Sequence, residues 1–84
     1  MAKVERIVWA QKYEDDVKKI KDKAVLQKLE KQVRKVVSNP SFGKPLKYGL
    51  KSEWATYVRP YRLIYKVEKN VLFLLRFEHR KKVY

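Results

Sequence analysis

The clearest structural signal in the sequence is the stretch Trp54-Ala55-Thr56-Tyr57-Val58-Arg59-Pro60-Tyr61-Arg62-Leu63-Ile64-Tyr65-Lys66-Val67. Its residues are largely aromatic and β-branched, which suits a pleated, half-buried surface. Pro60 falls where two strands would meet, and proline is tolerated in a turn but not in a central ladder. After Pro60 the side chains alternate between an apolar face (Tyr61, Leu63, Tyr65, Val67) and a mixed face (Arg62, Ile64, Lys66, Glu68). We therefore expect a β-hairpin that buries one face and presents Arg62 from a rigid strand on the other.

The apolar patterns on either side of this hairpin predict the remaining elements. A short strand is expected from Val4 to Trp9, helices from about Gln11 to Lys21 and Lys23 to Ser38, a loop from Ser38 to Ser52, and a buried strand from Val71 to Phe77. This order predicts one α+β domain over residues 1–84. In it the N-terminal strand, a two-helix hairpin and a three-stranded meander form a mainly antiparallel four-stranded sheet with both helices on one face.

Two groups of charged residues on the helices have more than one interpretation. The acidic trio Glu14, Asp15 and Asp16 resembles a metal cluster, but neighbouring helix positions point in different directions. Compensation of the helix dipole by acidic residues in the first turns is the favoured interpretation. The lysines of the second helix, Lys28, Lys31 and Lys35, could contact RNA, but a solvated helix face is favoured.

Positive charge is the dominant global feature. The 84 residues include 22 Lys and Arg against nine Asp and Glu, a net charge of +13. Residues 1–42 carry eleven basic and six acidic residues, and residues 43–84 carry eleven and three, so the excess is larger in the half that contains the hairpin. A surface of this kind indicates a polyanionic partner, either nucleic acid, the ribosome, an acidic membrane or an acidic protein. A surface that merely keeps the protein soluble is the simpler alternative.

Several classes of function find no support in the composition. There is no cysteine and only one histidine, so a disulfide framework and a thiolate metal site are excluded, and we expect neither metal nor cofactor. The two glycines, Gly43 and Gly49, are too few for a phosphate-cradling P-loop. No apolar run approaches the length of a membrane span, and the charged N-terminus is unlike a signal peptide, so we expect a cytoplasmic protein.

An ordered set of short motifs resembles the RelE/ParE superfamily of toxin–antitoxin toxins across nearly the whole chain. These motifs are Asn39-Pro40, Gly43-Lys44-Pro45-Leu46-Lys47, Leu50, Trp54, Tyr61-Arg62-Leu63-Ile64-Tyr65, His79-Arg80 and Val83-Tyr84. The resemblance implies either cleavage of mRNA in the ribosomal A site, as in the RelE-like branch, or poisoning of DNA gyrase, as in the ParE-like branch. The arginine after the hairpin tyrosine and the basic C-terminal segment that ends in tyrosine resemble the nuclease branch.

The sequence departs from the family pattern on the first hairpin strand and at the turn. The turn is Arg59-Pro60, where the family commonly has glycine followed by Asp or Asn. Tyr57 stands where a basic residue is common, and the lysines that assist some relatives are absent from residues 54–58. These departures bear on catalysis more than on the fold.

If the nuclease resemblance holds, the RNA supplies its own 2′-hydroxyl as nucleophile and no metal is needed. By position, the resemblance assigns catalysis to Arg62, Arg80 and Tyr84, with His79 at a position that is often basic. We expect Arg62, helped by Arg80, to stabilise charge on phosphorus, because a guanidinium binds two phosphate oxygens and stays charged. The simpler interpretation of Arg62 is a structural ion pair with a carboxylate such as Glu53 or Glu78.

The other candidate roles divide between proton transfer, stacking and phosphate contact. His79 is the natural proton-transfer residue. Tyr84 could stack on a base or simply pack on the sheet, and its α-carboxylate is a second proton acceptor. Contacts to backbone phosphates are expected from Lys47, Lys51, Arg59, Arg76, Lys81 and Lys82. Strand parity groups Arg76 with Leu72 and Leu74 but His79 with Phe73 and Phe77, so the strand must end or bend if Arg76 and His79 share a groove.

Three functions follow as hypotheses: a ribosome-dependent mRNA endoribonuclease toxin, a non-enzymatic gyrase inhibitor, and a basic RNA-binding module without catalysis. The resemblance also implies an acidic cognate antitoxin, with the toxin a monomer when free and a hetero-oligomer with its antitoxin. Ribosome and mRNA are the further expected partners, and no membrane is expected.

Overall fold

The computed structural model describes residues 4–46 and 53–79 of the chain. Within these ranges one five-stranded sheet has the strand order β1-β5-β4-β3-β2. The strands are β1 (Arg6–Trp9), β2 (Lys44–Pro45), β3 (Glu53–Val58), β4 (Tyr61–Glu68) and β5 (Val71–His79), and the helices are α1 (Gln11–Lys18) and α2 (Lys23–Ser38). Strand β1 pairs in parallel with β5, and the other pairings are antiparallel. No helix of the described residues is long and apolar enough to cross a membrane.

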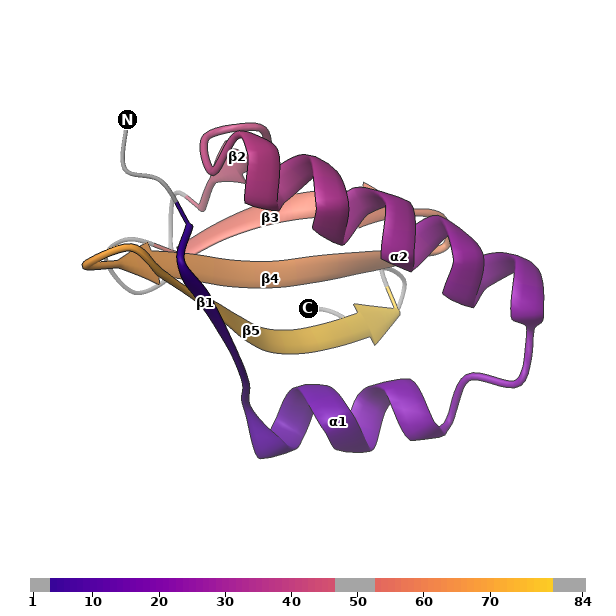
Figure 1. Cartoon of the computed structure of the whole chain (residues 1–84). Helices are drawn as coiled ribbons and strands as arrows, with labels where there is room; N and C mark the ends of the chain where they lie inside the picture. The colour runs from indigo at the N-terminus through magenta and orange to yellow at the C-terminus, as the bar shows by residue number, and fades with distance from the viewer. Residues whose placement is uncertain (1–3, 47–52, 80–84) are drawn as a thin grey trace.

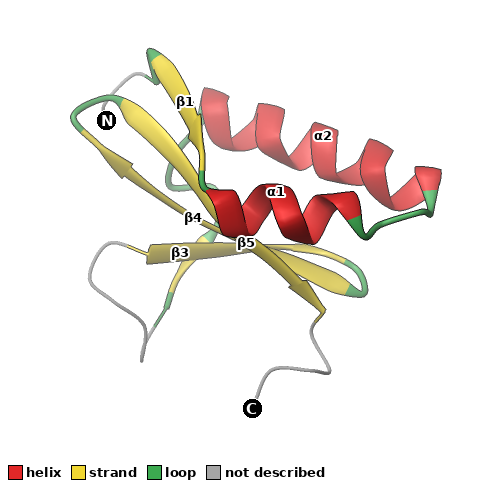
Figure 2. Cartoon of the chain, turned by 90° about the horizontal axis from the view of Figure 1, so that it is seen from below, coloured by secondary structure: helices red, strands yellow, loops and turns green. Residues whose placement is uncertain are grey.

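The predicted α+β architecture is confirmed, with the hairpin β3–β4 turning at Arg59-Pro60. Helix α1 packs along β5 and α2 lies against β3, and Figure 2 shows both helices on the same side of the sheet (Figures 1 and 2). The core between the layers joins apolar side chains of both helices to those of three strands: Tyr13, Val25, Leu29, Val36, Val58, Leu63, Tyr65, Leu72, Leu74 and Phe77. Burial of the apolar side chains along one face of each helix holds the helices to the sheet.

Two element boundaries differ from the sequence prediction. Helix α1 ends at Lys18 rather than Lys21, because the chain tightens there and the Ile20 amide donates to the carbonyl of Val17. The expected loop before the hairpin contains the fifth strand, β2, where Lys44 pairs with Ala55 and Pro45 with Trp54. A strand of two residues is too short to show the alternation of apolar and polar side chains by which strands are predicted. Its proline is compatible with an edge strand, which pairs on one side only.

A hydroxyl in the core fixes the segment that leads into β2. The Tyr65 hydroxyl donates to the carbonyl of Pro40 at 2.9 Å and accepts from the Gly43 amide at 3.0 Å. The backbone at Gly43 also lies so close to β3 that a Cβ there would be 2.5 Å from the Ala55 carbonyl oxygen. Glycine is therefore required at this position by close approach, and not by a phosphate-binding loop.

A β-bulge in β5 decides which residues share the face of the sheet opposite the helices. Ile64 pairs with Arg76 but Tyr65 pairs with Leu74, so Leu75 is an extra residue on β5. The bulge places Leu72, Leu74 and Phe77 together in the core despite their mixed parity. The parity prediction was therefore wrong for Arg76, which lies on the opposite face from Leu72 and Leu74.

Candidate functional site

Arg62 lies on β4, with a neighbouring strand on each side. Its register partners are Tyr57 on β3 and Glu78 on β5, so the three side chains form a row across the face opposite the helices. The guanidinium of Arg62 donates from Nη2 at 3.2 Å and Nε at 3.4 Å to Oε1 of Glu78. Arg62 is 21% exposed and Glu78 is 27% exposed, so solvent reaches the pair.

Arg76 extends this pair into a network of four alternating charges. Its Nη2 donates to Oε1 of Glu53 at 3.2 Å, and its Nε lies 3.6 Å from Oε1 of Glu78. Glu53 is only 6% exposed, and burial of a carboxylate is tolerable when it is paired in this way. The ion pair anticipated for Arg62 thus exists, with Glu78 as partner, while Glu53 is held by Arg76.

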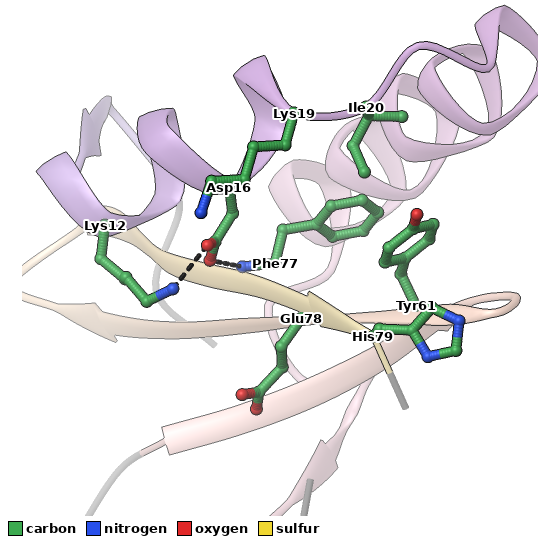
Figure 3. A pocket seen from close by; sticks show the side chains of 8 residues that line it. All are labelled: Lys12, Asp16, Lys19, Ile20, Tyr61, Phe77, Glu78 and His79. Atoms are coloured by element: carbon green, nitrogen blue, oxygen red, sulfur yellow. Dashed lines mark hydrogen bonds and ion pairs between the residues drawn. The ribbon is translucent and has the colours of Figure 1, made fainter. Parts of the chain in front are cut away.

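His79 projects from the other face of β5. Its register partner is Tyr61, and these two side chains lie on the helix side of the sheet, with ring centroids 5.2 Å apart in an edge-to-face arrangement. Figure 3 shows Glu78 pointing away from α1 while Phe77 points toward the helices. Because the pairing of β5 continues regularly to His79, the side chains of Glu78 and His79 project from opposite faces of the strand, although both residues line the pocket at its edge.

A pocket of about 400 Å³ opens beside His79, between α1 and the C-terminal end of β5 (Figure 3). Its floor is aromatic, because the rings of Tyr61 and Phe77 stack with centroids 4.9 Å apart. Its full lining is Lys12, Asp16, Lys19, Ile20, Tyr61, Phe77, Glu78 and His79. In residues 4–46 and 53–79, no three His, Cys, Asp or Glu side chains gather closely enough to hold a metal ion.

Asp16 has a role that the sequence did not indicate. Instead of compensating the helix dipole from the first turn, its buried carboxylate accepts a hydrogen bond from the Phe77 amide at 3.0 Å. Strand β1 has already ended at Trp9, opposite Leu74, so the carboxylate satisfies an amide of β5 beyond the β1–β5 pairing. Lys12 also binds Asp16, and this hydrogen bond raises the pKa of Lys12.

We expect Asp16→Ala to destabilise the protein by about 2 kcal/mol, because it leaves the buried Phe77 amide without an acceptor and removes a hydrogen bond to a charged group. Urea unfolding measures the loss. Asp15→Ala is the matched control, because Asp15 is exposed and should change stability by less than about 0.5 kcal/mol. An Asp16→Ala protein that unfolds at the wild-type urea concentration would show that the contact contributes nothing.

The other predicted site residues fall into two groups. Arg59 is exposed at the β3–β4 turn, and Arg76 lies in the charge network. The rest lie outside the described residues: Arg80, Tyr84, Lys47, Lys51, Lys81 and Lys82. Of the predicted cations within the described ranges, Arg62 and Arg76 are therefore the two that the fold brings to one face, and Glu78 is the carboxylate that joins them.

Comparison with known proteins defines the class to which this chain belongs. Residues 7–84 match the family model described as the ParE toxin of the type II toxin–antitoxin system parDE. The chain belongs to this family and is the toxin component of a type II toxin–antitoxin system. No curated protein gives a significant match to the sequence.

Solved structures of toxins share the fold over their whole length. The YoeB dimer from Staphylococcus aureus has a TM-score of 0.78 and 20% identity, with 93% of this chain and 98% of that chain covered. The RelB–RelE antitoxin–toxin complex from Methanococcus jannaschii gives 0.75 and 18%, covering 92% and 94%. The chromosomal ParDE system from P. aeruginosa gives 0.69 and 18%, covering 92% and 96%. At these identities the likenesses establish the fold.

Proposed function

We propose that this toxin is a ribosome-dependent mRNA endoribonuclease that acts in the cytoplasm and inhibits translation. The proposal rests mainly on the position of Arg62. This residue lies on β4, its guanidinium is oriented by Glu78, and it is partly exposed on the face opposite the helices. A preorganised guanidinium in this setting suits a phosphate whose charge increases during reaction. A second support is the resemblance to the RelE-like nuclease branch, which is found in the Tyr61–Tyr65 segment and in the C-terminal basic residues.

In the proposed reaction, the 2′-oxygen of one nucleotide attacks its own 3′-phosphate and the 5′-oxygen of the next nucleotide leaves. Arg62 stabilises the additional negative charge on the phosphoryl oxygens, with Arg80 as the second proposed cation. Tyr84 is proposed to stack on a base, and Lys47, Lys51, Arg59, Lys81 and Lys82 to contact backbone phosphates. Arg76 would have to share its guanidinium with Glu53 and Glu78 to do the same.

His79 remains a predicted proton-transfer residue, but its position imposes a condition. It lies on the helix side of the sheet, so it could serve a phosphate held by Arg62 only if the RNA crosses the edge of β5. The aromatic floor of the adjoining pocket offers a surface on which a base could stack there. A proton acceptor beside Arg62 must therefore come from another residue on the face of Arg62.

Inhibition of DNA gyrase is the second candidate function. The matching family model is named for ParE, and the solved ParDE system shares the fold. On β3, the positions that face Arg62 and Ile64 are Tyr57 and Ala55, so this strand adds no cation to the row. A toxin that acts by protein contact has no need of those cations.

Two assays in parallel distinguish the candidates. Primer extension on ribosome-bound mRNA with added toxin should show new cleavage ends, while gyrase supercoiling proceeds normally at the same toxin concentration. Inhibited supercoiling with intact mRNA would establish the gyrase function instead. If neither activity is seen but RNA is retained, the protein is a basic RNA-binding module.

The antitoxin partner is expected to be acidic and partly disordered before it binds, because such a segment can cover a large basic surface. Solved relatives include toxin–antitoxin complexes. We expect the Kd of the complex to rise steadily between about 0.1 and 1 M NaCl, over which the Debye length falls from about 10 to 3 Å. Titration calorimetry at several salt concentrations measures this. A Kd independent of salt would indicate an interface held by apolar contacts.

A further inference from the structure

Tyr57, Arg62 and Glu78 occupy directly opposite positions on three neighbouring strands. Tyr57 pairs with Arg62 and Arg62 pairs with Glu78, and all three side chains lie on the face opposite the helices. Since neighbouring strands lie about 4.8 Å apart, the row spans about 10 Å. Tyr57 is 40% exposed at one end and Glu78 is 27% exposed at the other, so a strand of RNA can reach both ends from solvent.

The pairing between Arg62 and Glu78 leaves both groups with capacity for a substrate. Arg62 uses Nε and Nη2 on Glu78, and a guanidinium has five N–H donors, so donors remain for a phosphate. The contacts from Arg62 and Arg76 all go to the same oxygen of Glu78, Oε1. A carboxylate has two oxygens with about four acceptor sites, so it can accept a further proton donor.

We propose that Glu78 is the proton acceptor of the cleavage reaction, an inference that rests on the proposed endoribonuclease function. Glu78 takes the proton of the 2′-hydroxyl as the bond between O2′ and phosphorus forms. The bond from phosphorus to the 5′-oxygen breaks, and this oxygen takes a proton from a water molecule. Glu78 then returns its proton to the hydroxide that remains, so the products are a 2′,3′-cyclic phosphate and a free 5′-hydroxyl and the enzyme is restored.

Position decides between Glu78 and His79 for this role. Both residues line the same pocket, but Glu78 contacts the arginine that would bind the phosphate, whereas His79 projects from the other face of the strand. The phosphate held by Arg62 and the 2′-hydroxyl of the same nucleotide are only a few bonds apart. The acceptor must therefore lie next to Arg62, within hydrogen-bond reach.

Several charged groups surround Glu78 and can influence how the cleavage rate depends on pH. Arg62 on β4 and Arg76 on its own strand contact its carboxylate, and Lys12 on α1 interacts with it electrostatically. The remaining ionisable groups that line the adjoining pocket are Asp16, Lys19, Tyr61 and His79. Because His79 is among them, the experiment includes a His79 variant beside the Glu78 variants.

The test is single-turnover cleavage of mRNA on programmed ribosomes as a function of pH, with wild type, Glu78→Gln, Glu78→Asp and His79→Gln. We expect Glu78→Gln to lower the rate by about 10²–10⁴-fold and to abolish the fall in rate at acidic pH. Glu78→Asp should keep that acidic limb at a reduced rate, and His79→Gln should keep it as well. Glu68→Gln, an exposed change at the far end of β4, is the matched control and should behave as wild type.

Thermal melts of the same preparations show whether each variant is folded. A folded Glu78→Gln protein that cuts at the wild-type rate would overturn the inference and leave the proposed function standing. So would a slow Glu78→Gln protein that keeps the acidic limb, because Glu78 would then act only by fixing Arg62. If wild type itself does not cut, the proposed function fails and this inference fails with it.

Discussion

Arg62→Ala is expected to lower the single-turnover rate of mRNA cleavage by about 10²–10³-fold, the usual cost of removing one donor that stabilises charge in a transition state. Ribosome binding should change little, because it is spread over many of the 22 basic residues. Arg62→Lys should recover little of the rate, since an ammonium cannot hold Glu78 and a phosphate with the same planar set of donors.

The pairing of Arg62 with Glu78 makes a stability control necessary. The pair is partly exposed, so we expect its loss to cost no more than about 1 kcal/mol of folding free energy. Lys28→Ala and Lys31→Ala, on the exposed face of α2, should alter neither rate nor stability. If Arg62 serves only as an ion-pair partner, Arg62→Ala will melt at a lower temperature and cut at the normal rate per folded molecule.

Gly43→Ala is expected to destabilise the protein by about 3 kcal/mol or more. The new Cβ would lie 2.5 Å from the Ala55 carbonyl oxygen and 2.8 Å from the Tyr65 hydroxyl oxygen. Overpacking of this kind costs about 1–3 kcal/mol, and displacing the Tyr65 hydroxyl also weakens its bonds to Gly43 and Pro40, at a further cost of about 1 kcal/mol or more.

Urea unfolding, with Lys44→Ala as the matched control, tests this expectation. Lys44 is the next residue and is exposed, so its truncation should change the free energy of unfolding by less than about 0.5 kcal/mol. Equal stability of Gly43→Ala and wild type would mean that the backbone of residues 39–43 can move away from β3 at no cost. The packing described for this segment would then be wrong.

The hairpin was predictable because its signals are local. Alternation after Pro60 placed Leu63 and Tyr65 in the core and Arg62 on the other face, as the structure has them. The apolar residues of both helices recur at helical spacing, and this pattern was enough to predict that both helices pack on the sheet. Strand β2 was not predictable, because its two residues gain their strand character from pairing with β3 and not from their own sequence.

The arrangement of the site was less accessible to sequence reasoning, since one bulge changes which residues are neighbours. If β5 were regular at Leu75, with no bulge, Arg76 would lie on the same face as Leu74 instead of contacting Glu53 and Glu78. The sequence of β5 contains no residue, such as a glycine, that would have indicated a bulge. Asp16 was missed for a similar reason, because its partner is the Phe77 amide, 61 residues along the chain.

The most direct measurement replaces the ribose at the cleaved nucleotide of a ribosome-bound mRNA with 2′-deoxyribose. The proposed mechanism requires the 2′-hydroxyl, so the all-ribose mRNA should be cut to a product that ends in a 2′,3′-cyclic phosphate, and the deoxy mRNA should remain intact. Equal cleavage of both mRNAs would contradict the mechanism. If both stay intact while gyrase supercoiling is inhibited, the endoribonuclease function itself is wrong.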